Sequence, residues 1–147
     1  MVKEISTEII INSTPEKLWN VLVDFHNYSK WNPFIVSITG QPKTGEKIEL
    51  QLHLKSGRNR TYHPTITKME KPSEIRWKGK LLSSSLFEGE RVLKIEKIDN
   101  KSVTFINKEV FSGIASSFTP KKMDSDIEES FQMMNTALKN WIEQEVT

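Results

Sequence analysis

The chain has 147 residues, 36% of them hydrophobic, which is enough for one domain with a buried core over residues 1–147. Its 21 basic and 19 acidic side chains leave a net charge of only +2, which argues against a surface that follows nucleic-acid phosphates. The absence of cysteine excludes disulfides, thiolate catalysis and thiolate metal sites.

The first residues enter a strand-like pattern without a preceding apolar signal region, and no apolar run is long enough to span a bilayer. We therefore expect a cytoplasmic protein that does not insert stably into a membrane. Neither a membrane nor a nucleic acid is expected among its stable partners.

A strand and two short helices are predicted in the N-terminal part of the chain. Residues 4–12 alternate like a strand. Residues 13–16 read Ser-Thr-Pro-Glu, which is typical of a helix start: a hydroxyl N-cap, a proline in the first turn and an acid near the positive helix end. A second short helix at residues 24–31 should end before Pro33, because the residue before a proline avoids the helical conformation.

The central region predicts a run of strands that are joined by short turns. The expected strands cover residues 34–39, 47–54, 60–69, 74–80, 86–98 and 102–111. Pro64 lies inside one of them and indicates a sheet edge or a bulge at that point. Short turns between consecutive strands imply an antiparallel sheet.

From Met123 the hydrophobic period changes from 2 to 3.6, which predicts a long amphipathic helix reaching nearly to the C-terminus. Its apolar face carries Ile127, Phe131, Met134, Leu138 and Trp141. An antiparallel sheet has one face to bury, and this helix is the expected cover. The predicted fold class is therefore α+β.

Three stretches carry a family resemblance. They are an aromatic Trp-x-Pro passage at residues 25–34, Gly89-Glu90-Arg91 with residues 109–113, and residues 134–139 near the end of the last helix. In this order they resemble the START-like (SRPBCC) superfamily of helix-grip proteins, and its polyketide cyclase/dehydrase-like branch most closely.

The resemblance implies a curved antiparallel sheet of about six to seven strands wrapped around the long C-terminal helix. Two short helices would follow the first strand, and a cavity would lie between the sheet and the long helix. Relatives often carry His where this chain has Arg91, so the resemblance implies no imidazole role at this position.

The hairpin formed by the strands at 86–98 and 102–111 is the most informative part of the chain. Alternation places Arg91 and Glu109 on faces that otherwise carry apolar side chains. A three-residue turn at 99–101 would set Arg91 directly opposite Glu109, whereas a two-residue turn would shift the register. The two charges would form either a structural ion pair or a polar anchor for a ligand carbonyl, hydroxyl or carboxylate.

The expected ligand cavity combines this charged pair with apolar and aromatic side chains of the sheet and the last helix. Core packing is the alternative interpretation for most of these apolar residues. The expected lining consists of Trp31, Phe34, Leu50, Leu52, Tyr62, Trp77, Phe87, Arg91, Phe105, Glu109, Phe111, Phe131 and Met134.

We expect a binding protein for a small apolar or amphipathic molecule of lipid or polyketide type, rather than an enzyme. One alternative is a cyclase or dehydrase that uses Glu109 and Tyr62, although a salt bridge to Arg91 would lower the pKa of Glu109 and oppose its use as a base. Another alternative is a protein-interaction or chaperone-regulator-like domain whose cavity has closed.

No cofactor and no metal are expected. The three histidines lie on different predicted elements, and no two of them have the spacing of metal ligands. The serines and glycines form neither a nucleophile elbow nor a phosphate-binding loop. The expected partner is a small hydrophobic ligand, bound by a monomer or a homodimer.

Overall fold

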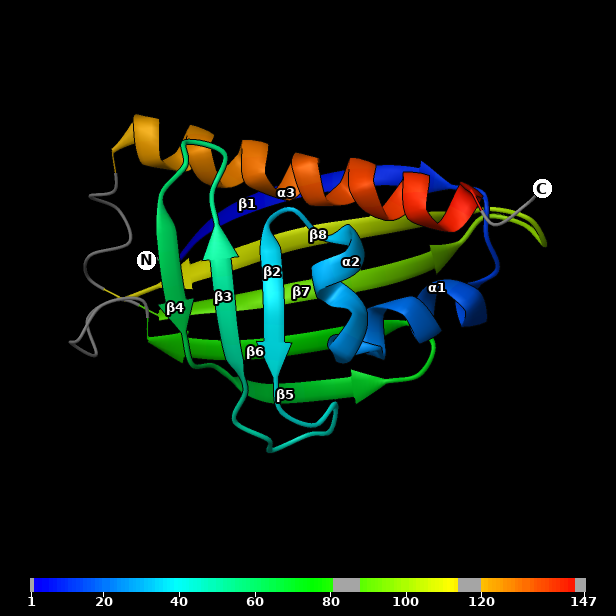
Figure 1. Ribbon diagram of the computed structural model, residues 1–147, viewed down its shortest axis with the longest axis horizontal. Coiled ribbons are helices and arrows are strands. Elements are labelled where there is room, and N and C mark those ends of the chain that lie inside the picture. The colour runs from blue at the N-terminus through cyan, green and yellow to red at the C-terminus, as the bar shows by residue number, and fades with distance from the viewer. Residues whose placement is uncertain (1, 81–87, 114–119, 145–147) are drawn as a thin grey trace.

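The structure is a computed structural model that describes residues 2–80, 88–113 and 120–144, and it contains two antiparallel sheets and a long helix (Figure 1). The larger sheet has the order β1-β8-β7-β6-β5. Its strands are β1 (Val2–Ile11), β5 (Thr65–Glu70), β6 (Glu74–Lys80), β7 (Glu88–Lys97) and β8 (Val103–Ser112). The smaller sheet comprises β2 (Ile35–Thr39), β3 (Glu49–His53) and β4 (Asn59–Tyr62).

Short helices connect β1 to β2. They are α1 (Pro15–Val23), the 3₁₀ helix η1 (Phe25–Asn27) and α2 (Tyr28–Trp31). The predicted start of α1 is confirmed: Pro15 opens the helix, and the Thr14 hydroxyl accepts a hydrogen bond of 3.2 Å from the backbone N–H of Lys17. The Asn32 side-chain oxygen accepts hydrogen bonds from the backbone N–H groups of Phe34 and Ile35. These two bonds stabilise the turn from α2 into β2.

The α+β helix-grip fold is confirmed, but one predicted strand is divided in two. Residues 60–69 form β4 and β5, with Pro64 between them. Proline has no backbone N–H to continue a ladder, and its carbonyl instead accepts a hydrogen bond of 2.9 Å from Ile48. The described residues therefore form eight strands, where about six to seven were expected.

The last helix, α3 (Lys121–Glu143), lies along the larger sheet on the side of β1, while β2, β3 and β4 cross in front of that sheet (Figure 1). The apolar core fills the space enclosed by these layers. The ring centroids of Phe34, beside β2, and Phe131, on α3, are 5.8 Å apart. Phe131, Met134 and Leu138 are fully buried, as the helical period predicts.

Candidate functional site

The predicted register of the β7–β8 hairpin is confirmed. Arg91 lies opposite Glu109, and Ile95 lies opposite Phe105. The backbone N–H of Ile98 donates to the carbonyl of Ser102 at 3.0 Å, which closes the three-residue turn. The strands therefore carry two opposite charges side by side on the face that points into the core.

Both charged side chains are buried, with 4% of Arg91 and 6% of Glu109 exposed. The Arg91 Nε–H donates to Glu109 Oε1 at 3.3 Å, and its Nη1–H donates to Asn107 Oδ1 at 3.2 Å. The two donors thus serve different acceptors, and the ion pair rests on a single hydrogen bond instead of a two-bond fork.

Aromatic rings lie close to the Arg91 guanidinium. Its central carbon is 4.0 Å from the ring centroid of Phe131 and 5.2 Å from that of Phe34. A cation within about 6 Å of a ring centroid is attracted by the ring quadrupole. The rings therefore replace part of the solvation that the guanidinium loses by burial.

Polar side chains extend the site away from the ion pair. The amide N–H of Asn107 donates to Asn135 Oδ1 at 2.9 Å, and the amide N–H of Asn135 donates to Thr7 Oγ1 at 2.9 Å. The Thr7 hydroxyl returns a bond of 2.8 Å to the backbone carbonyl of Asn107. All three residues are buried, so one hydrogen-bonded chain links Glu109 and Arg91 to β8, α3 and β1.

Sequence reasoning missed these three polar residues, although a signal was present. Asn107 occupies an inward position between Phe105 and Glu109, and Thr7 lies on the inward face of β1. Asn135 follows Met134 and lies one helical turn after Phe131. A polar residue at an inward position of an apolar face is the same observation that identified Arg91 and Glu109.

Burial decides the protonation behaviour of the pair. It raises the pKa of Glu109 above its ordinary value, and the Arg91 charge offsets this only in part. Arg91 thus lowers the pKa of Glu109, as expected from the sequence. Desolvation of the carboxylate raises that pKa by more than Arg91 lowers it, so the net shift is upward. Burial likewise lowers the pKa of Arg91, against the opposing effect of Glu109.

Tyr62 lies near the pair and stays protonated. Burial raises the pKa of its phenol, and the neighbouring Glu109 charge raises it further. Its hydroxyl donates to the backbone carbonyl of Gly89 at 3.3 Å. Gly79 lies opposite Gly89, and a Cβ atom at Gly79 would be 2.8 Å from the Tyr62 oxygen, so the glycine is needed for this close approach.

The structure brings most of the expected lining residues into one continuous apolar core. Trp77 lies directly opposite Arg91, Phe111 opposite Gly89, and Leu50 opposite Tyr62. Leu52 is only half-buried, and Phe87 lies outside the described residues. The buried apolar and aromatic members are Trp31, Phe34, Leu50, Tyr62, Trp77, Phe105, Phe111, Phe131 and Met134.

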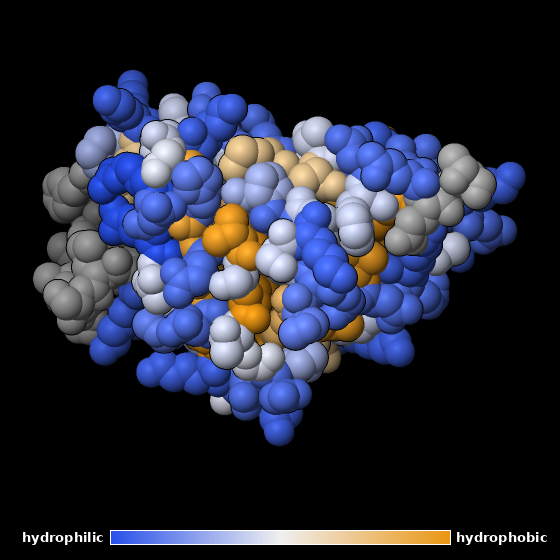
Figure 2. Space-filling view, viewed as in Figure 1, coloured by the Kyte–Doolittle hydropathy of each residue, from blue (hydrophilic) through white to orange (hydrophobic). Residues whose placement is uncertain are grey.

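Two hollows in the described part of the chain lie away from the charged pair. One, of about 490 Å³, is open to the surface and lined by residues of α1, the segment from η1 to α2, and α3. Trp31 is the expected lining residue that borders it. The other, of about 450 Å³, lies against the outer side of α3. The face that carries β2, β3 and β4 is mainly hydrophilic, with apolar groups reaching the surface at its centre (Figure 2).

Within residues 2–80, 88–113 and 120–144, no three histidine or carboxylate side chains are grouped as a metal site would require. The helices in the same ranges include none that is both long and apolar enough to cross a membrane.

The chain has the START-like helix-grip fold of the SRPBCC superfamily. The sequence model of one family, described as "Polyketide cyclase / dehydrase and lipid transport", matches residues 3–140, and the chain belongs to this family. No curated protein matches the chain.

Solved structures share the fold at low sequence identity. A START superfamily protein from Mycobacterium smegmatis has a TM-score of 0.76 at 15% identity, covering 97% of this chain and 98% of its own. The Zhui aromatase/cyclase from Streptomyces sp. R1128 has a TM-score of 0.79 at 13% identity, covering 100% and 97%. A hypothetical protein from Helicobacter pylori has a TM-score of 0.75 at 18% identity, covering 95% and 87%.

Proposed function

We propose that residues 1–147 act as one START-like ligand-binding domain, which holds a small apolar or amphipathic molecule between the sheets and α3. The observation that carries this proposal is the buried Arg91–Glu109 pair on an otherwise apolar face. Buried ion pairs are weak evidence for stability, because desolvation offsets most of their attraction. A pair retained in such a place is better suited to orienting a polar group of a ligand.

Some N–H donors of Arg91 remain available for a polar group of a ligand. A guanidinium carries five N–H donors, and the hydrogen bonds within the described residues use those on Nε and Nη1. A ligand carboxylate, carbonyl or hydroxyl would accept from Nη2, while its apolar part would contact Phe34 and Phe131. The family description includes lipid transport, which agrees with this class of ligand.

Ligand entry requires movement of side chains, because Phe131 and Met134 are fully buried and pack against the polar site. Methionine is suited to this role, since its unbranched thioether adapts to different apolar shapes. Phe131 would exchange its contact with the Arg91 guanidinium for contact with the ligand.

The neutral fluorophore N-phenyl-1-naphthylamine tests this proposal. We expect saturable binding to the wild type and its loss in Met134→Arg, because a second cation would occupy the interior. Ile10→Arg is the matched control, since Ile10 is 57% exposed, and this variant should bind as the wild type does. Dodecanoate should displace the fluorophore from the wild type but not from Arg91→Met/Glu109→Leu, which keeps an apolar interior without the charges.

A cyclase- or dehydrase-type reaction is the second candidate, and the raised pKa of Glu109 favours it. A carboxylate with a raised pKa is a better base for removing a proton from carbon beside a carbonyl group. The protonated Tyr62 phenol would turn its single O–H from the Gly89 carbonyl to the developing oxyanion. Deuterium exchange into the methyl group of acetophenone in D₂O measures this step. Equal exchange rates for wild type and Glu109→Gln would remove Glu109 from the role.

If neither binding nor exchange is observed, the packed interior fits the third alternative, a protein-interaction domain with a closed cavity.

A further inference from the structure

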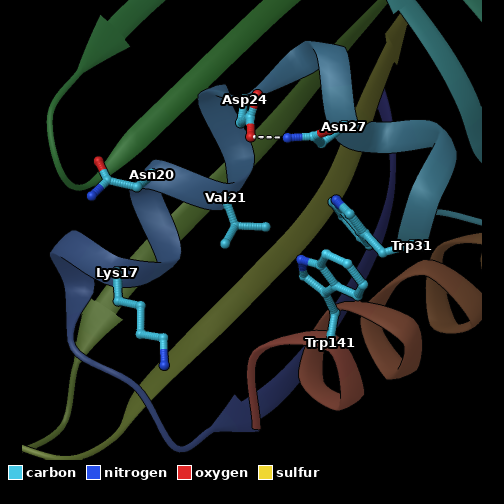
Figure 3. A pocket seen from close by; sticks show the side chains of 7 residues that line it. All are labelled: Lys17, Asn20, Val21, Asp24, Asn27, Trp31 and Trp141. Atoms are coloured by element: carbon cyan, nitrogen blue, oxygen red, sulfur yellow. Dashed lines mark hydrogen bonds between the residues drawn. The ribbon is translucent and has the colours of Figure 1, made fainter. Parts of the chain in front are cut away.

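The hollow lined by α1, the segment from η1 to α2, and α3 has the features of a binding site separate from the interior. Its volume of about 490 Å³ lies within the range of small-molecule sites, which is roughly 300–1,000 Å³. Its lining residues come from distant parts of the chain: Lys17, Asn20, Val21, Asp24, Asn27, Trp31 and Trp141. The side chains of Trp31 and Trp141 stand across the hollow from α1 (Figure 3).

Trp31 supplies the sharpest observation at this hollow. Its side chain is buried, with 8% of the residue exposed, and its Nε1–H has no hydrogen-bond partner among the described residues. Buried donors in native proteins are almost always paired, so an unpaired one asks for an explanation. In Figure 3 the ring nitrogens of Trp31 and Trp141 lie on the sides of the rings that face the hollow.

The Trp31 ring is held in place by its neighbours. The ring centroid of Tyr28 is 5.0 Å away, and the Tyr28 hydroxyl donates to the carbonyl of Leu22 at 2.6 Å. The Trp31 nitrogen is itself buried, so a ligand oxygen reaches it only if a neighbouring side chain moves. Trp141, half-buried near the end of α3, is the candidate for this movement. A rigid donor beside an adjustable aromatic wall suits a planar ligand.

The hydrogen-bonding groups of the hollow favour an acceptor. The acid in the lining, Asp24, already accepts a bond of 2.6 Å from the Asn27 amide. The indole N–H groups of Trp31 and Trp141 are donors only, and neither has an acceptor among the described residues. A ligand that brings oxygen acceptors therefore satisfies groups that this part of the chain leaves unpaired.

We propose that this hollow is a second binding site, which takes a small aromatic carboxylate. The ring of the ligand contacts Val21, and its carboxylate accepts hydrogen bonds from the indole N–H groups of Trp31 and Trp141. This site does not depend on the interior site around Arg91, and either can exist without the other.

Nuclear magnetic resonance of the indole N–H groups tests this proposal with 2-naphthoate as the probe. The chain has four tryptophans, which give four separate reporters. We expect saturable shifts of the Trp31 and Trp141 signals and an unchanged Trp77 signal. Trp77 lies opposite Arg91 in the core, so a shift of Trp77 alone would mean interior binding and would overturn the second site while leaving the proposed function intact.

Replacing tryptophan by phenylalanine removes the indole N–H donor but keeps an aromatic ring, so it measures the contribution of the hydrogen bond to binding. Trp31→Phe should weaken 2-naphthoate binding about tenfold, the effect of losing one hydrogen bond to a charged group. Trp19→Phe is the matched control, because Trp19 is equally buried but does not line the hollow, and its affinity should equal that of the wild type. Trp141→Phe, at a half-buried position, repeats the test if Trp31→Phe does not fold.

A ligand of opposite charge completes the experiment. 2-Naphthylmethylammonium has the same rings but offers donors instead of acceptors, and it should bind at least about tenfold more weakly. Equal or tighter binding of the ammonium compound would overturn the assignment of the hollow to carboxylates. Absence of a saturable shift with 2-naphthoate up to its solubility limit would overturn the site altogether.

Discussion

Arg91→Met should lower the free energy of unfolding by about 3–5 kcal/mol at pH 8, because it leaves the Glu109 carboxylate buried without a counter-charge. The same change also removes the hydrogen bond to Asn107 and the guanidinium contact with Phe131. Urea denaturation of the wild type and the variant measures the difference directly.

The stability lost in Arg91→Met should be smaller at low pH than at high pH. Arg91 opposes the rise in the pKa of Glu109, so without Arg91 that pKa rises further. A carboxyl whose pKa is raised by folding contributes its full stability below the unfolded pKa and loses it as the pH rises through the folded pKa. The variant should therefore be closer to the wild type at pH 5 than at pH 8.

Two further variants complete this comparison. The double variant Arg91→Met/Glu109→Leu should recover most of the lost stability, because apolar side chains of similar volume replace a buried pair at little cost. Arg60→Met, at an exposed position on β4, should change stability by less than about 0.5 kcal/mol. A loss for Arg91→Met that is independent of pH would contradict the view that Glu109 is the group left uncompensated.

Glu109→Gln should change how the free energy of unfolding depends on pH. Burial raises the folded-state pKa of Glu109 above its unfolded value, so ionising it costs stability as the pH rises. Glutamine does not titrate. The variant should therefore gain stability relative to the wild type with increasing pH, by at most about 1.4 kcal/mol for each pH unit between the unfolded and the folded pKa of Glu109.

Denaturation of both proteins in urea between pH 4 and pH 8 measures this difference. The other carboxyl groups are common to both chains, so their titration cancels to a first approximation. A variant that instead loses stability relative to the wild type as the pH rises would show that attraction to Arg91 outweighs burial, and that the pKa of Glu109 is lowered.

Local patterns in the sequence were sufficient for the elements and the hairpin register. The alternation along β7 and β8, together with the turn at residues 99–101, placed Arg91 opposite Glu109. The residues at 13–16 located the start of α1. The division of residues 60–69 into β4 and β5 was signalled by Pro64, but whether a proline bends a strand or ends it depends on the partners that the surrounding sheet offers.

The arrangement of the site depends on packing between distant segments, which local patterns do not contain. Thr7, Asn107 and Asn135 meet only because β1, β8 and α3 pack together, so their hydrogen bonds could not be derived from spacing. The net shift in the pKa of Glu109 likewise depends on how completely the pair is buried, whereas the sequence suggested only the sign of the Arg91 effect. Whether aromatic side chains line a cavity or fill it is also a matter of packing.

In the proposed function, a ligand enters the interior and contacts Arg91. Titration with dodecanoate, followed by nuclear magnetic resonance of the Arg91 Nε–H and the Trp77 indole N–H, tests this most directly, because the two residues lie opposite each other in the core. We expect both signals to shift together and to saturate at one ligand per chain, while the Trp141 signal stays in place. Unchanged Arg91 and Trp77 signals up to the solubility limit of dodecanoate would contradict it.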